Sequence, residues 1–322
     1  MNVSMTGGSG FIGKLLCKAL VSRGDVVTLL SRKGRVEQDV AVVVGDLTED
    51  SASLDSFVAN CDVLYHCAGE IANTALMHRL HVKGTTSLLA AVQRRIKRTG
   101  IPVHWVQLSS TGAYGRQADL AQIDESFDPA PVGEYEVTKT IADELVVALA
   151  AIEPLFTFTI VRPTVVIGQS MPNQSFFQLA RMVGKGWFFY IGKAASNVST
   201  YVHVNDVVSA LIACGNDSRA AGHTFIIAND CAQKDVIDAF AQFTGRKKPS
   251  LQIPESVLRF LMRIIPSSVR LPLTPQRVDA LVKKGGYANR HIREVLGFRF
   301  EYPIPESVPD VLRGNVLPGS SD

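Results

Sequence analysis

Two groups of residues in this chain have types and spacing that could do chemistry. The first is the run TGGSGFIG over residues 6–13, which lies between a short apolar start and an apolar-periodic segment. That order predicts a strand, a glycine turn and a helix. Such a turn offers backbone N–H groups and the positive end of a helix dipole to a pyrophosphate. We therefore predict a dinucleotide site, with Gly7 for the tight turn, Gly10 for close approach of the phosphates, and Gly13 for close helix–strand packing.

The second group is Tyr135 and Lys139, four residues apart in a segment with helical periodicity. Residues at this spacing share one face of a helix. A lysine beside a phenol favours the phenolate, so we expect the pKa of Tyr135 to be lowered toward neutrality. Such a phenol can exchange a proton with an alcohol or ketone during hydride transfer. Taken alone, the pair is common and usually structural; its weight comes from its place after a predicted strand of the same sheet.

Small hydroxyl residues form a third group, directly after a predicted strand over 103–108. Side chains at such strand ends point into the ligand crevice of a parallel sheet. Ser110 or Thr111 could therefore donate a hydrogen bond to a substrate carbonyl and polarise it. A serine-rich turn without any chemistry is the alternative, and it is the commoner one.

The elements that must position these groups alternate between strand and helix. Strands are predicted over 26–30, 41–44, 62–66, 103–108 and 156–161, and helices over 77–98 and 135–151. This alternation predicts a parallel sheet covered by helices on both faces. Its ligands would lie beyond the carboxyl ends of the strands.

The pattern changes after Pro163, where shorter elements predict a smaller, irregular lobe. One stretch in it, 257–265, has an amphipathic pattern with two arginines. Packing against the core with the arginines at the rim is the commoner meaning of such a stripe. Contact with a membrane or with an apolar substrate is the alternative.

Bulk properties exclude several classes of protein. The chain has 322 residues, 46% of them hydrophobic and 20% charged, with a net charge of +3. That charge is too small to predict nucleic-acid binding. No signal peptide or membrane-spanning run is expected. The five scattered cysteines include no CxxC pair, so neither a disulfide framework nor a metal site is predicted, and a reducing cytoplasm is the simplest compartment.

Together these groups resemble the extended short-chain dehydrogenase/reductases, specifically the NAD-dependent epimerase/dehydratase family, over most of the chain. The resemblance implies an α/β fold, a Rossmann-like doubly wound parallel sheet with a smaller, mostly helical C-terminal substrate lobe. Residues 1–165 would form the dinucleotide-binding domain, to which 202–228 returns. Residues 166–201 and 229–322 would form the substrate-binding lobe. The family also implies a homodimer through helices of the first lobe.

The resemblance assigns roles to individual residues. Tyr135 would be the general acid/base, Lys139 would lower its pKa and bind the nicotinamide ribose, and Ser110 would orient the substrate oxygen. Substrate contacts are expected by position at Glu70, Thr111 and Tyr114. The cofactor would be held by Gly7, Gly10, Phe11, Ile12, Gly13, Ser31, Arg32, Asp46, Leu47, Cys67, Ala68, Gly69, Tyr135, Lys139, Pro163 and Thr164.

The sequence departs from the family at His81. Members often carry Asn at this position, where it bends the helix and supports a proton relay. A histidine can also relay protons near neutral pH. A histidine packed beside the sheet is the alternative.

The end of the second strand bears on the choice of cofactor. Proteins that bind NAD usually have an acidic residue there for the ribose 2′-OH. This chain has Ser31 and Arg32 instead, and a guanidinium suits a 2′-phosphate. We therefore favour NADP(H), with Arg35 as a helper, and leave NAD(H) open. The alternative is that Arg32 is only a solvated charge.

Three functions remain open on these grounds. The first is hydride transfer on a nucleotide sugar by a 4-epimerase or 4-keto reductase, since 111–113 lacks the Asp-Glu pair of sugar dehydratases. The second is an NADPH-dependent reductase of a lipophilic ketone, like dihydroflavonol reductases or hydroxysteroid dehydrogenases. The third is a cofactor sensor without catalysis, which the presence of Tyr135 and Lys139 disfavours. The substrate is a small molecule in the first two cases.

Overall fold

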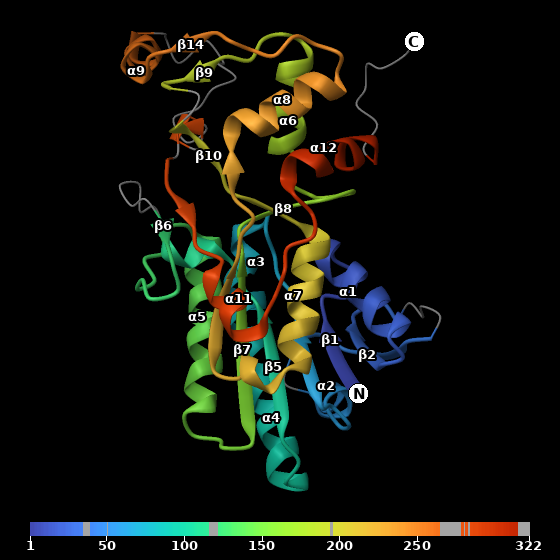
Figure 1. Cartoon of the computed structure of the whole chain (residues 1–322). Helices are drawn as coiled ribbons and strands as arrows, with labels where there is room; N and C mark the ends of the chain where they lie inside the picture. The colour runs from blue at the N-terminus through green and yellow to red at the C-terminus, as the bar shows by residue number, and fades with distance from the viewer. Residues whose placement is uncertain are drawn as a thin grey trace.

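A seven-stranded sheet forms the centre of the protein, here described from a computed structural model (Figure 1). The structure describes residues 1–34, 39–49, 51–115, 122–193, 196–264, 278–279, 281–282 and 284–314. The proposed helper Arg35 lies outside these ranges. The sheet has the order β12-β7-β5-β4-β1-β2-β3, and every pair in it is parallel. Its strands are β1 (Asn2–Thr6), β2 (Val26–Ser31), β3 (Ala41–Val44), β4 (Val63–His66), β5 (Val103–Leu108), β7 (Phe156–Pro163) and β12 (His223–Ile227).

Helices bury an apolar face on each side of this sheet. One side packs against α1 (Phe11–Ser22), α7 (Val204–Asn216) and α11 (Arg290–Leu296), which contribute Leu16, Leu211 and Ile292 to one core cluster. The other side packs against α2 (Ala52–Phe57), α4 (Gly84–Thr99) and α5 (Glu134–Ala150), which contribute Leu54, Leu88 and Val146 to a second cluster. The predicted α/β, Rossmann-like doubly wound fold is confirmed.

The helix predicted over 77–98 is divided into three parts. It begins as α3 (Thr74–His78), continues as a π-helix over Arg79–Lys83, and ends as α4. A π-turn inserts one extra residue into a helix and often occurs at functional sites. Here it contains His81, so the departure noted in the sequence coincides with a local change in helix geometry.

A second, smaller lobe lies above the carboxyl ends of the strands (Figure 1). Its core lies between α6 (Ser175–Gly184), α8 (Gln233–Phe243) and α12 (Ile304–Arg313), which bury Phe176, Phe240 and Val308 together. Short strand pairs connect its segments: β8 (Val165–Ile167) with β11 (Tyr201–His203), β9 (Tyr190–Ile191) with β14 (Gln252–Ile253), β10 (Val198–Ser199) with β13 (Cys231–Ala232), and β6 (Gln122–Ile123) with β15 (Gly286–Tyr287).

Two features of this lobe differ from the sequence expectations. The range 229–322 was assigned to the outer lobe, yet α11 within it packs against the sheet through Ile292. The stretch 257–265 contains α9 (Glu255–Ile264), where Leu258 is buried but Val257 and Phe260 are exposed. The core-packing interpretation therefore holds for Leu258 and is wrong for Val257 and Phe260. Within the described residues, no helix has the length and apolar character needed to cross a membrane.

Candidate active site

The predicted site residues converge because the strands that precede them are neighbours in the sheet. The glycine turn follows β1, residues 67–69 follow β4, Ser110 follows β5, and Thr164 follows β7. Ser31 is the last residue of β2. Since β2, β1, β4, β5 and β7 are consecutive and parallel, all these segments lie along one edge of the sheet.

The glycine turn is a cradle that has no space for side chains. Gly7 has φ +72°, and a Cβ on it would lie 2.5 Å from the carbonyl carbon of Cys67. The Gly10 N–H donates to the Gly7 carbonyl at 2.9 Å, and α1 begins at the next residue. A Cβ on Gly13 would lie 2.1 Å from the same carbonyl oxygen. The turn therefore presents bare backbone at a helix N-terminus, which fits the pyrophosphate of a dinucleotide.

Phe11 has a second role in this turn. Its ring lies 3.1 Å from the position that a Cβ on Gly168 would take, and it packs against the core of the outer lobe. The side chain thus connects the two lobes. Only its backbone belongs to the helix N-terminus that could bind a phosphate.

Helix α5 carries three polar side chains on one face, at intervals of one turn: Tyr135, Lys139 and Asp143. The start of the helix is fixed by Glu136, whose carboxylate accepts from the Val132 and Gly133 N–H groups at 2.9 and 3.0 Å. This contact satisfies two backbone donors just before the helix, fixes the residue at which α5 begins, and so positions Tyr135 in its first turn.

Burial controls the protonation of Tyr135. It raises the pKa of Tyr135 to about 12, and the Asp143 carboxylate acts in the same direction. The pKa lowering expected from Lys139 is therefore wrong for this conformation of the protein. The Lys139 Nζ instead donates to the Leu108 carbonyl at 2.5 Å. At neutral pH Tyr135 holds its proton, which is the state of a general acid.

A buried charge network lies one turn beyond Lys139, and the sequence reasoning missed it. Asp143 is 2% exposed and Arg162 is 7% exposed. The Asp143 Oδ2 accepts from the Arg162 guanidinium at 3.1 Å and from the Ser109 hydroxyl at 2.7 Å. Burial raises the pKa of Asp143, while Arg162 and Lys139 oppose that rise. The signal available in the sequence was the i, i+4, i+8 spacing on α5.

The two serines after β5 have different environments. Ser109 is buried in the charge network, whereas Ser110 is half-buried and accepts from the Gly112 N–H at 3.1 Å. Adjacent residues in an extended segment point to opposite sides, so Ser110 faces away from Asp143. The neighbouring Thr111 is buried and donates to the Pro163 carbonyl at 3.3 Å.

His81 connects the π-helix to α5. Its Nε2 accepts from the Glu70 N–H at 2.9 Å, so Nδ1 carries the proton and donates to the Thr138 hydroxyl at 2.8 Å. The imidazole also meets the Tyr135 ring edge to face, with centroids 5.6 Å apart. Burial lowers the pKa of His81 to about 4, and the Lys139 ammonium adds to that lowering. His81 is thus a neutral imidazole that links the Glu70 backbone to α5, with both ring nitrogens in hydrogen bonds. This arrangement disfavours the proton relay.

The neutral state of His81 should make the stability of the protein depend on pH. Native His81 stays neutral down to about pH 4, whereas the unfolded chain takes up a proton near pH 6.5, so stability falls as pH falls through this window. We expect His81→Gln, which keeps one donor and one acceptor, to lose about 2 to 3 kcal/mol less between pH 7 and pH 4.5 than the wild type. Urea unfolding at both pH values measures this difference. Equal losses in the two proteins would contradict it.

The end of β2 is polar and basic. Arg32 is exposed, and the Ser31 hydroxyl accepts from the Lys33 N–H at 3.3 Å. After the neighbouring strand β3, the Thr48 N–H donates to Asp46 Oδ1 at 2.8 Å and lowers the pKa of Asp46. Arg32 and a cation that the sequence reasoning did not include, Arg79 of the π-helix, add to this lowering. Leu47 is buried against Gly84.

Three other predicted site residues are Glu70, Tyr114 and Thr164. The first two make contacts within the protein, and the third has a buried hydroxyl without a partner among the described residues. The Glu70 carboxylate accepts from the Ala72 and Asn73 N–H groups, at 2.8 and 3.0 Å, just before α3. The Arg162 guanidinium lies over the Tyr114 ring, 4.9 Å from its centroid. The Thr164 hydroxyl, directly after β7, is buried without a hydrogen-bond partner among the described residues.

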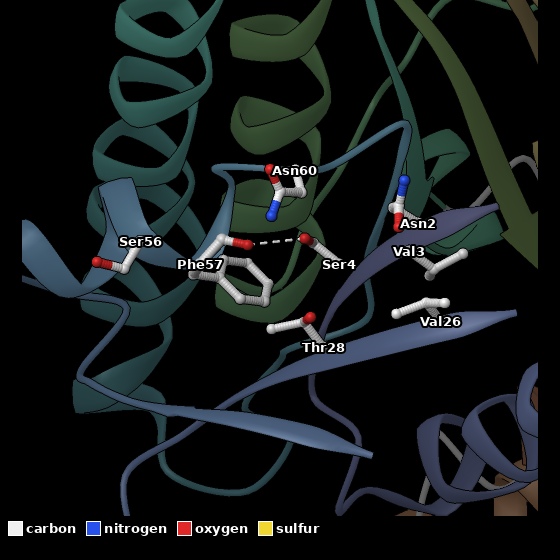
Figure 2. A pocket seen from close by; sticks show the side chains of 8 residues that line it. All are labelled: Asn2, Val3, Ser4, Val26, Thr28, Ser56, Phe57 and Asn60. Atoms are coloured by element: carbon white, nitrogen blue, oxygen red, sulfur yellow. Dashed lines mark hydrogen bonds between the residues drawn. The ribbon is translucent and has the colours of Figure 1, made fainter. Parts of the chain in front are cut away.

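A separate small cavity lies at the opposite end of the strands (Figure 2). It has a volume of about 90 Å³ and is lined by the first residues of β1 and β2 and by the end of α2. The Ser4 hydroxyl donates across it to the Phe57 carbonyl at 2.8 Å. Small-molecule pockets are usually about 300 to 1,000 Å³, so this cavity is not the dinucleotide site.

Comparison with known proteins agrees with the site geometry. Residues 3–228 match the model of the NAD dependent epimerase/dehydratase family. The chain belongs to this family. It is therefore an NAD(P)-dependent enzyme of the epimerase and oxidoreductase type, an extended short-chain dehydrogenase/reductase.

Family members with curated functions resemble the chain at low identity. UDP-glucose 4-epimerase of Vibrio cholerae is 26% identical over 267 residues, covering 79% of this chain and 78% of that protein. A ketoreductase of Stigmatella aurantiaca, which acts on 4-hydroxy-2-methyl-3-oxo-4-farnesyl-3,4-dihydroquinoline-1-oxide, is 36% identical over 179 residues. That match covers 52% of this chain and 51% of the relative.

Two solved structures share the fold of this chain. UDP-glucose 4-epimerase of Thermotoga maritima, solved with UDP-glucose, superposes with a TM-score of 0.74 over 98% of both chains at 17% identity. RMD from Pseudomonas aeruginosa, solved with NADPH, gives a TM-score of 0.68 over 98% of this chain and 99% of that one at 20% identity.

Proposed function

We propose that this enzyme transfers hydride between NADP(H) and a carbinol or ketone carbon of a nucleotide sugar, as a 4-keto reductase or 4-epimerase, with Tyr135 as the acid/base. The observation that carries the proposal is the position of Tyr135 and Lys139 on α5, beside the strand ends that hold the glycine cradle and Ser110. The match to UDP-glucose 4-epimerase, which spans most of both chains, supports a sugar nucleotide.

In this proposal each group of residues has a separate role. The backbone over 7–13 would hold the pyrophosphate, and Ser110 would donate to the substrate oxygen. Tyr135, which keeps its proton at neutral pH, would give that proton to the same oxygen as the carbonyl is reduced. A bound nicotinamide supplies the hydride. Lys139 would keep positive charge near the phenolate that remains, which lowers the energy of that product state.

Arg32 is expected to select NADP(H), and the sequence prediction stands as part of this proposal. Its exposed guanidinium at the end of β2 can form a bidentate pair with a 2′-phosphate. Arg32→Asp should weaken NADPH binding about 10- to 100-fold and favour NADH. Fluorescence titration with both cofactors measures the ratio, and Arg98→Asp at the exposed end of α4 is the matched control. A wild type that binds NADH as tightly as NADPH contradicts the assignment.

A second candidate is an NADPH-dependent reductase of a lipophilic ketone. The 36% identity to a ketoreductase with a farnesylated substrate favours it, as does the cation at the end of β2. Under this candidate Tyr135, Lys139 and Ser110 keep the same roles. The difference lies in the outer lobe, which would enclose an apolar substrate instead of a uridine diphosphate.

One assay separates the candidates. The purified protein is mixed with NADPH or NADP⁺ and with nucleotide sugars, 4-keto sugars, flavanonols or hydroxysteroids, while absorbance follows the cofactor and chromatography follows the substrate. Net cofactor oxidation with a 4-keto sugar identifies the reductase. A changed sugar without net cofactor change identifies the epimerase, and turnover of the apolar ketones alone favours the second candidate. Cofactor binding without any turnover would contradict both and favour a sensor.

The homodimer remains a prediction of the family resemblance. Val147 on α5 and Ile152 just after it are exposed apolar side chains on the outer side of the first lobe. We propose that they contribute to the contact between copies. Sedimentation velocity of the wild type and of Val147→Lys tests this, because a charge at a buried contact should shift the protein toward monomer.

A further inference from the structure

Several large apolar side chains at the outer end of the second lobe are exposed to solvent. Trp187 is 66% exposed and Phe260 is 62% exposed, and Leu251 and Val257 are exposed as well. Scattered single apolar residues on a surface are ordinary, but a contiguous group marks a contact site. These four exposed side chains come from two segments that are paired through β9 and β14, so this end of the lobe is a candidate contact site.

Backbone pairing brings these residues to the same end. Strand β9 pairs with β14, and the Tyr190 N–H at the start of β9 donates to the carbonyl of Leu251, the residue before β14, at 2.9 Å. Trp187 comes shortly before β9, and α9 starts directly after β14. In α9, Leu258 packs inward against Ile191, which leaves Val257 and Phe260 on the outward face. Figure 1 shows α9, β9 and β14 together at the end of the molecule farthest from α4.

The same segments carry positive charge. The Lys185 ammonium lies over the Trp187 ring, 4.8 Å from its centroid, and the Arg246 Nε donates to the Gly184 carbonyl at 2.9 Å. Lys185, Arg246 and Lys247 are exposed, and none of them forms an ion pair within the described part of the chain. Three carboxylates of this lobe are paired with other cations: Asp238 with Lys234 and Lys248, and Glu255 and Asp279 with Arg259.

We propose that this end of the outer lobe docks on an anionic lipid surface. Tryptophan rings favour the headgroup region of a bilayer, and apolar side chains beside them can enter the acyl boundary. Lysine and arginine around them are attracted to anionic headgroups. A second copy docking through the same end would place these cations opposite one another, so a symmetric contact is repelled. The proposal is independent of the substrate assigned above.

Tryptophan fluorescence reports this contact directly. The chain has two tryptophans, of which Trp105 is fully buried and Trp187 is exposed. We expect vesicles of phosphatidylcholine with phosphatidylglycerol to shift the emission to the blue, pure phosphatidylcholine to leave it unchanged, and about 0.5 M NaCl to reverse the shift by screening. Trp187→Phe, which retains Trp105, should show no shift although it still folds.

Charge variants measure the electrostatic part by vesicle co-sedimentation of the full chain. Lys185→Gln and Lys247→Gln should each weaken binding to the anionic vesicles about fivefold. Lys97→Gln and Arg98→Gln, at the exposed end of α4, are matched controls that should not. Equal binding to neutral and anionic vesicles, or an equal loss in the controls, would overturn the proposal. So would the absence of vesicle binding together with an oligomer that Phe260→Ser dissociates, because the occupant would then be a second copy.

Discussion

Tyr135→Phe is expected to reduce kcat by about 10²- to 10⁴-fold, the usual contribution of a positioned general acid. The substitution removes only the phenol oxygen, so the ring keeps its edge-to-face contact with His81. Cofactor affinity should be unchanged, because the backbone of the glycine turn between β1 and α1 is proposed to hold the pyrophosphate, and the substitution does not alter that backbone. Steady-state kinetics and a fluorescence titration with NADPH measure the two quantities separately.

Tyr302→Phe is the matched control for this experiment. Tyr302 stacks on His203 and lies partly exposed outside the site, so loss of its hydroxyl should leave kcat intact. A Tyr135→Phe enzyme with the wild-type rate would remove Tyr135 from the mechanism. Reduced rate together with lost cofactor affinity would mean that the phenol acts in binding.

Asp143→Ala is expected to destabilise the protein by about 3 to 5 kcal/mol, because it leaves a buried guanidinium without its counter-charge. Arg162 is 7% exposed and lies over Tyr114, so water cannot replace the lost carboxylate. The Ser109 hydroxyl loses its acceptor at the same time. Urea unfolding of the whole chain measures the change in the free energy of unfolding.

Two comparisons show whether the effect comes from the buried pair. The exposed pair Asp310–Arg313, with nitrogen and oxygen 3.4 Å apart, is the control, and Asp310→Ala should cost less than about 1 kcal/mol. The double variant Asp143→Ala/Arg162→Met should lose less than the sum of its single variants, since the two side chains interact. Additive losses, or an Asp143→Ala effect as small as that of the control, would contradict the assignment.

Local sequence patterns were sufficient to predict the strands of the central sheet, helix α5 and the glycine turn. Each strand of the sheet has a short apolar run with turn residues beside it, and the pattern follows from burial on both faces. The range predicted for α5, 135–151, agrees with Glu134–Ala150 to within one residue at each end. The glycine turn was recognisable because its glycines follow one another between a strand and a helix, although the segment that excludes a side chain at Gly7 is Cys67 after β4.

Contacts between residues that are far apart in the chain could not be predicted from the sequence. Asp143 meets Arg162 from the neighbouring strand, and His81 meets Thr138 across 57 positions. The pKa of Tyr135 was predicted to fall and instead rises, since burial dominates and Lys139 bonds to Leu108. The π-turn at His81 also leaves no periodicity that distinguishes it from an ordinary helix.

By itself, the sequence indicated the alternation of strands and helices, the glycine turn and the spacing of Tyr135 and Lys139, because each is a pattern of residues close together in the chain. Only the tertiary structure decided which groups are buried, and burial sets both protonation and charge pairing. It paired Asp143 with Arg162, fixed His81 in its neutral form, and left Trp187 and Phe260 exposed, although packing against the core was expected for Phe260. Burial depends on every segment that packs against a residue, and no single stretch of sequence contains that information.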